Sequence, residues 1–183
     1  MTAGKLSGLA CEPGYYHGFT GYILYDDIEG YVENAVFSMD AYRSYHQLDF
    51  HEGTWVDGIW PYGHWRGGTW KNGTWKYGFW HDGTWLDGIW LDGDWDTGTW
   101  HGGSWDNGIW RGGDWLDGTW NDGGWKRGTW HGGTWNFGRW EEGQWLGGTW
   151  KNGFDRGFFT HENEPPDTWK EQYGTTWKRR RGL

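Results

Sequence analysis

The chain of 183 residues has a single cysteine, Cys11, so no disulfide can form within one molecule. It has no apolar run of membrane-spanning length, and its first residues lack the long apolar stretch of a secretory signal. These absences predict a protein that is made and kept in the cytoplasm, unless an assembly carries it elsewhere.

The sequence also lacks the motifs that carry catalysis. It has no nucleophile motif, no phosphate-binding loop and no cluster of Cys and His with metal-ligand spacing. His81 and His101 come closest to a metal site if residues 20 apart lie together, but two ligands without a third bind weakly. We therefore expect a protein that is not an enzyme and has no cofactor or metal.

Aliphatic residues are scarce as well, whereas glycine and tryptophan are abundant. The chain has 36 Gly and 22 Trp, but residues 53–152 contain only eight Val, Ile or Leu. So many aromatic side chains argue against disorder, because disordered segments are poor in large apolar groups. The chain is thus expected to fold, and tryptophan is the only residue type that can supply its core.

A pentad repeat organises most of the chain. Trp occupies every fifth position from Trp55 to Trp150, and a glycine stands two places before each Trp. This gives twenty Gly-x-Trp-x-x units between Gly53 and Asn152. A period of five matches neither a helix nor plain strand alternation, so each unit needs a short extended piece and a bend. Asp, Asn or Gly usually precedes the glycine, as bends require, and Thr most often precedes Trp, as strands favour.

The position of Trp decides the architecture. Because no second core exists, Trp must face inward and the residue before it outward. The pattern predicts an all-β fold, a right-handed quadrilateral β-solenoid with four pentads per coil and about five coils of 20 residues. Residues 20 apart would then stack. One predicted core ladder contains Trp55, Trp75, Trp95, Trp115 and Trp135, and the next contains Trp60, Trp80, Trp100, Trp120 and Trp140.

In these features the chain resembles the pentapeptide-repeat family, whose units read roughly Ala-(Asp or Asn)-Leu-x-x. The resemblance covers Gly53 to Asn152 and implies a four-sided β-helix. It is a divergent one, because Gly replaces Ala, Trp replaces Leu, and Asp precedes the large residue only at Asp94 and Asp114. An antiparallel meander is the alternative fold, since Trp-x-Asp-Gly-x-Trp also reads as a hairpin. Such a sheet would leave Trp on an open face.

The ends of the chain depart from the repeat. Residues 1–40 are predicted to form an N-terminal arm or cap of short strands, with a possible short helix over 33–45. Residues 41–157 are predicted to form the solenoid, which is regular over 53–152 and begins with a degenerate coil in which Leu48 takes the glycine position. Residues 158–183 are predicted to form a C-terminal cap and a basic tail.

Three surfaces are candidates for contacts with other molecules. A partly apolar strip on one side is a docking candidate and contains Thr69, Ile89, Leu91, Ile109, Thr129 and Thr149. An acidic face would contain Asp94, Asp96, Asp114 and Asp117. The basic tail would contain Lys178, Arg179, Arg180 and Arg181, and it is the only part expected to favour nucleic acid, because the net charge of the chain is −9.

These features favour a structural or interaction protein. We expect a rigid spacer or docking module that contacts other proteins, or further copies of itself, in a larger assembly such as a phage head, tail or baseplate. One alternative comes from the resemblance, because pentapeptide-repeat relatives include acidic rods that imitate DNA and occupy type II topoisomerases. Another alternative is an aromatic glycan-binding module, which requires the Trp rings to face outward.

Overall fold

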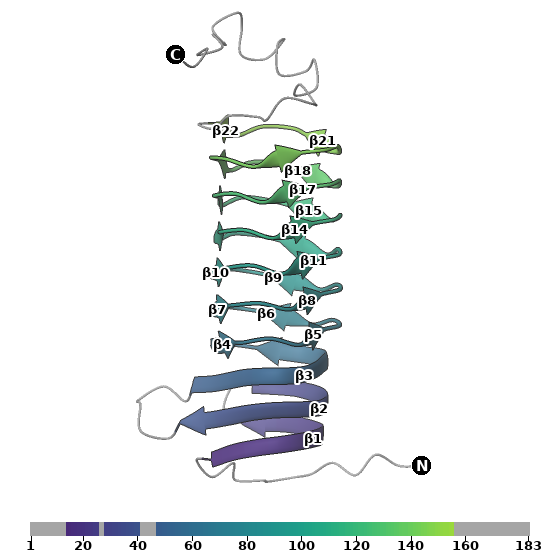
Figure 1. Ribbon diagram of the computed structural model, residues 1–183, viewed down its shortest axis with the longest axis vertical. Helices are drawn as coiled ribbons and strands as arrows, with labels where there is room; N and C mark the ends of the chain where they lie inside the picture. The colour runs from purple at the N-terminus through teal and green to yellow at the C-terminus, as the bar shows by residue number, and fades with distance from the viewer. Residues whose placement is uncertain (1–13, 26–27, 41–46, 156–183) are drawn as a thin grey trace, which may run out of the picture.

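The computed structural model describes residues 14–25, 28–40 and 47–155, and these form strands and bends with no helix (Figure 1). No described segment is therefore a helix long and apolar enough to cross a membrane. Three long strands come first, and short strands of two or three residues follow. The strands are β1 Gly14–Tyr25, β2 Ile28–Asp40, β3 Gln47–Trp60, β4 Gly63–Trp65, β5 Thr69–Trp70, β6 Thr74–Trp75, β7 Phe79–Trp80, β8 Thr84–Trp85, β9 Ile89–Trp90, β10 Asp94–Trp95, β11 Thr99–Trp100, β12 Ser104–Trp105, β13 Ile109–Trp110, β14 Asp114–Trp115, β15 Thr119–Trp120, β16 Gly124–Trp125, β17 Thr129–Trp130, β18 Thr134–Trp135, β19 Arg139–Trp140, β20 Gln144–Trp145, β21 Thr149–Trp150 and β22 Phe154–Asp155.

The short strands stack as a parallel β-solenoid in which three pentads complete one coil. Thr99 pairs with Thr84 and Trp100 pairs with Trp85, and the same spacing of three pentads recurs along the array. The predicted parallel solenoid is confirmed and the antiparallel meander is wrong for the pentads. The predicted four-sided coil of four pentads is also wrong, because the solenoid has three sides and roughly seven coils.

We call the three sides face A, face B and face C and define them by their Trp columns. Face A carries Trp55, Trp70, Trp85, Trp100, Trp115, Trp130 and Trp145. Face B carries Trp60, Trp75, Trp90, Trp105, Trp120, Trp135 and Trp150. Face C carries Trp65, Trp80, Trp95, Trp110, Trp125 and Trp140.

Two backbone hydrogen bonds tie each pentad to the previous coil. The N–H of the residue before Trp donates to a glycine carbonyl, as in Thr84 to Gly68 at 2.9 Å. The N–H of the residue after Trp donates to the carbonyl of a Trp, as in Leu86 to Trp70 at 2.8 Å. The same two bonds recur along the rod, so short strands are sufficient to hold successive coils together.

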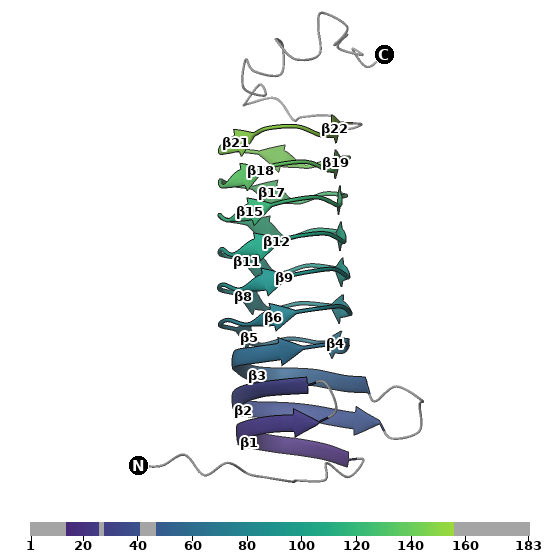
Figure 2. The same cartoon turned by 180° about the vertical axis from the view of Figure 1, so that it is seen from behind.

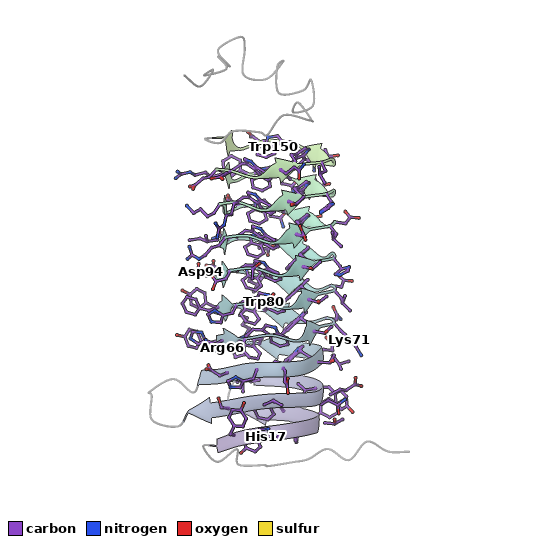
Figure 3. The ribbon with its side chains drawn as sticks, viewed as in Figure 1. His17, Arg66, Lys71, Trp80, Asp94 and Trp150 are labelled. Atoms are coloured by element: carbon purple, nitrogen blue, oxygen red, sulfur yellow. The ribbon has the colours of Figure 1, made fainter. Side chains whose placement is uncertain are left out.

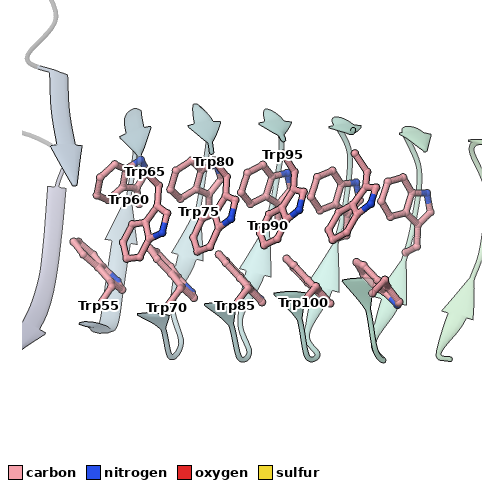
Figure 4. Packing of buried hydrophobic residues seen from close by; sticks show 14 of the residues in the cluster. Trp55, Trp60, Trp65, Trp70, Trp75, Trp80, Trp85, Trp90, Trp95 and Trp100 are labelled. Atoms are coloured by element: carbon pink, nitrogen blue, oxygen red, sulfur yellow. The ribbon is translucent and has the colours of Figure 1, made fainter. Parts of the chain in front are cut away.

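Tryptophan fills the core, as predicted, but in columns of a different spacing. Every Trp from Trp55 to Trp140 is fully buried. Rings one coil apart on the same face stack with centroids 4.6–5.2 Å apart and interplanar angles of 4–8°. Rings of consecutive pentads meet edge to face at 5.6–6.1 Å (Figure 4). The predicted ladders, which joined every fourth Trp, are wrong because such residues lie on different faces.

The glycine of each pentad forms a corner of the coil. At Gly83 φ is +129°, a backbone conformation that glycine adopts readily and other residues rarely adopt. Three indoles then meet around the axis. Four indoles at the same spacing would leave opposite rings about 8 Å apart, and close-packed interiors do not tolerate such a void.

Close approach of the backbone also excludes a side chain at these corners. A Cβ on Gly83 would lie 2.5 Å from the carbonyl oxygen of Gly68 in the previous coil and 3.2 Å from Nε1 of Trp65. The indole of Trp65 is near, but the carbonyl of Gly68 is the closer obstacle.

At its N-terminal end the rod consists of an antiparallel sheet of β1, β2 and β3, which curves around the same axis as the coils (Figure 2). Gly30 of β2 lies against the indole of Trp55, so closely that a Cβ would overlap the ring. In β3, Phe50 stacks on Trp65 at 4.1 Å and Leu48 pairs with Gly63, which confirms that Leu48 takes a glycine position.

The predicted helix over 33–45 is wrong for its described part, because residues 33–40 belong to β2. Pairing with strands on both edges satisfies the backbone of β2, and this tertiary context overrides local helix preference.

Candidate interaction surfaces

Faces A and B present columns of threonine. The residue before each Trp points outward, and successive rungs of a parallel sheet lie about 4.8 Å apart. On face A this residue is threonine at positions 54, 69, 84, 99 and 129, and on face B at positions 74, 119, 134 and 149. Face C has no threonine at this position. The three sides of the rod therefore differ chemically.

Face C carries a column of charged and histidine side chains directly after its core rings. These residues occur at every fifteenth position: His51, Arg66, His81, Asp96, Arg111, Lys126 and Glu141. They form ion pairs with one another and with acidic residues beside them. Arg66 and Asp94 lie on the same side of the rod (Figure 3). Because positive and negative groups lie in contact, the column largely neutralises itself.

Arg111 contacts two carboxylates of face C. Its guanidinium lies 2.7 Å from Oδ2 of Asp94 and 3.3 Å from Oδ1 of Asp96. Nearer the N-terminal end of the same face, Arg66 lies 3.1 Å from Asp49. All of these side chains are partly exposed, so water and salt weaken each pair. The column is expected to fix side-chain positions more than to add stability.

His64 and His81 meet on face C. Nδ1 of His64 lies 3.1 Å from Nε2 of His81, and Nδ1 of His81 lies 3.1 Å from Oδ2 of Asp96. The predicted proximity of His81 and His101 is wrong, because His101 follows a Trp of face A. Within residues 14–25, 28–40 and 47–155, no three His, Cys, Asp or Glu side chains are grouped so that they could hold a metal ion.

Face B carries a smaller network of polar groups. The amide nitrogen of Asn121 donates to Oδ1 of Asp106 at 2.8 Å and to Oγ of Ser104 at 3.1 Å. Asn136 continues the column by donating to Oδ1 of Asn121 at 2.7 Å. These side chains satisfy one another, so the network is a stacked structural column rather than an open binding site.

The predicted docking strip is not a single surface. Thr69 and Thr129 lie on face A, whereas Ile109 lies on face C. The remaining members, Ile89, Leu91 and Thr149, belong to face B. Residues 20 apart were expected to align, but three pentads per coil distribute them around the rod. Only Ile89 and Leu91, which flank the same Trp, remain neighbours, and both are exposed.

The predicted acidic face is also divided. Asp94 and Asp96 lie on face C in contact with Arg111, whereas Asp114 and Asp117 belong to face A. Asp117 uses Oδ1 to accept a hydrogen bond from the backbone N–H of Gly118, the next corner. The four carboxylates therefore do not form one continuous acidic face.

The two remaining candidate surfaces are outward-facing Trp rings, which would bind glycans, and the basic tail. The glycan-binding alternative required outward Trp rings, but the rings of all twenty pentads are buried. The basic tail of Lys178, Arg179, Arg180 and Arg181 lies outside the described residues.

Sequence reasoning missed the charge column of face C, although a signal for it exists. Every fifteenth residue from His51 to Glu141 is charged or a histidine. Tyr62 and Tyr77 have the same separation along the chain and stack with ring centroids 5.9 Å apart. A search of the sequence for repeats of 10, 15 or 20 residues would have detected this recurrence every 15 residues. It would have indicated three pentads per coil before any geometry was known.

In comparisons with known proteins, no family model, no curated protein and no solved structure matched the chain.

Proposed function

We propose that this protein is a non-catalytic structural rod that serves as a rigid spacer or docking module in a larger assembly. The observation that carries the proposal is the core of three unbroken columns of buried indoles between Trp55 and Trp150. Each inner ring is stacked on both sides and flanked edge to face. Bending such a rod would separate close-packed rings and lengthen backbone hydrogen bonds on one side. Stiffness follows from this packing.

The different faces support a role in positioning. Threonine columns occupy faces A and B, and the charge column occupies face C, so each face keeps a fixed direction along roughly seven coils. A partner bound to one face would therefore be held at a fixed angle and height relative to either end. We further propose that the chain is a three-sided analogue of pentapeptide-repeat proteins, supported by the shared pentad with a large inward residue.

Purification at native level from the source organism tests the proposed role. A structural component should be recovered in a defined stoichiometry with other proteins, and cross-links should map to particular faces or ends of the rod. A virus particle is the proposed setting. Recovery of the protein with no stable partner would contradict the proposal.

Deletions of whole repeats can distinguish two possible roles of the rod, that of a spacer and that of a module that docks through one face. Removing residues 84–98 takes out one whole coil and keeps every later residue on its own face, while shortening the rod by about 4.8 Å. Removing residues 84–88 preserves the Gly-x-Trp pattern but moves every later residue to the neighbouring face. Both variants should fold. Docking through a face predicts that only the shorter deletion disrupts assembly, whereas spacing predicts that the whole-coil deletion disrupts it too.

A further inference from the structure

The strand β1 ends the rod on its N-terminal side. Within the described part of the chain, β1 pairs with β2 alone, whereas β2 pairs on both edges. Among the described residues, no strand pairs with the second edge of β1, which is 12 residues long. Such an edge is a template for pairing with another strand.

The sequence of β1 lacks the residues that usually prevent pairing at an exposed strand edge. GYYHGFTGYILY contains no Asp, Glu, Lys, Arg or Pro, the residues that natural proteins use to protect exposed edges. Its backbone has two register irregularities against β2, near Phe19, but Gly21 to Tyr25 pair in a regular register. An uncharged strand can also face a copy of itself without repulsion between like charges.

The core is incomplete at this end. Tyr16 stacks on Phe37 at 4.8 Å, and Phe19 meets the same ring edge to face at 5.7 Å. Both residues pack against the core but are only partly buried, in contrast to the indoles above them. Tyr15 and Tyr22 are about half exposed on the outer side of the strand. Another layer placed against β1 would bury more of this aromatic surface.

We infer that two copies of the chain join end to end by pairing their β1 strands about a two-fold axis. The strands β3, β2 and β1 alternate in direction, and a strand antiparallel to β1 would continue that alternation. A two-fold axis perpendicular to the rod supplies such a strand from a second copy. The pairing makes one antiparallel sheet of six strands between two coaxial solenoids. This inference does not depend on the proposed role in an assembly.

Mass measurement of the purified full-length chain by sedimentation or light scattering tests this dimer. The wild type should have twice the chain mass. The double variant Tyr15→Lys/Tyr22→Lys places like charges on both strands and should weaken dimerisation on the order of tenfold or more. Thr84→Lys/Leu86→Lys adds the same charge to face A and should leave the dimer unchanged. Circular dichroism and Trp emission establish that each variant is folded.

Cysteine cross-linking locates the contact. In a background with Cys11→Ser, single cysteines replace Tyr15, His17, Thr20 or Tyr22. Side chains nearest a two-fold axis meet their own copies, so at least one of these variants should form a disulfide-linked dimer under mild oxidation. Thr99→Cys, in the middle of face A, should not. A dimer in which no β1 cysteine cross-links and the lysine variant has no effect overturns the inference.

Deletion of residues 1–13 tests whether the chain's own first residues, rather than a second copy, pair with the edge of β1. If two copies pair through β1, the shortened chain and the full chain should both be dimers. A full-length monomer overturns the inference, and so does a dimer that appears only after the deletion, because the edge would then be covered by the chain's own first residues.

Discussion

Trp85 and Trp100 lie one coil apart with parallel rings, their centroids 4.7 Å apart and their planes 5° from parallel. Trp85 also meets Trp90 edge to face at 6.0 Å. Both centroid distances lie in the range of about 4.5–7 Å that aromatic pairs prefer, and the edge-to-face contact sets a positive ring edge against a negative ring face. The core is therefore a network of nearest-neighbour contacts, and the stability of each coil depends on the coils beside it.

Removing one inner indole should strongly lower the stability of the fold. Trp100 is fully buried and contacts Trp85, Trp95, Trp105 and Trp115. Trp100→Ala should lower the free energy of unfolding by about 3–5 kcal/mol, through lost burial and the cavity that remains. Leu86→Ala, at an exposed position of face A, should change it by no more than about 0.5 kcal/mol. Unfolding in guanidinium chloride measures both, and equal losses would contradict the described core.

The effect of a Gly→Ala substitution on stability should depend on the position of the glycine within the pentad. Gly83→Ala forces a side chain onto positive φ and toward the carbonyl oxygen of Gly68, so it should destabilise the protein by about 3 kcal/mol or more. Gly124 precedes a Trp, and a Cβ there has no atom within 4 Å. Gly124→Ala should be neutral or stabilise by about 0.4–1 kcal/mol, because it restricts the unfolded chain. Thermal or denaturant unfolding of both variants decides whether corner glycines are required.

The charge column of face C should contribute little to stability. Arg111 contacts two carboxylates but is 43% exposed, so Arg111→Ala should cost about 1 kcal/mol or less at low salt. Adding salt to about 1 M should remove most of that difference, because the Debye length falls to about 3 Å. Lys76→Ala on face B is the matched control. A loss of several kcal/mol that persists in high salt would show that the column supports the fold.

The pentad could be interpreted from sequence because its information is local. Asp-Gly at the bend and Thr beside Trp specify a corner and a strand, and the scarcity of aliphatic residues places Trp in the core. In the structure Asp87 accepts a hydrogen bond from the N–H of Gly88 at 2.7 Å, which gives the Asp-Gly pair its physical role. These inferences depend only on neighbouring residues and on burial.

The number of pentads per coil could not be obtained in the same way, because it depends on the angle turned at each corner. That angle follows from the positive φ of glycines such as Gly83 and from the fit of three indoles around an axis. With the wrong coil length, Ile89 and Ile109 were assigned to one side although they lie on faces B and C. Residues 33–40 of β2 were predicted as helix for a similar reason, since their conformation is determined by two partner strands rather than by their own sequence.

The solvent accessibility of tryptophan provides the most direct check of the architecture in solution. The chain has 22 Trp, of which 20 occupy the pentads, and those from Trp55 to Trp140 are fully buried. Acrylamide quenches indole fluorescence by contact, so it should quench the pentad indoles poorly in the native state and efficiently after unfolding. Trp169 and Trp177 lie outside the described residues, and Trp169→Phe/Trp177→Phe leaves only the pentad signal. Efficient quenching of that double variant in the folded state would mean that the indoles are not enclosed, and the stiffness inferred from their packing would have no physical basis.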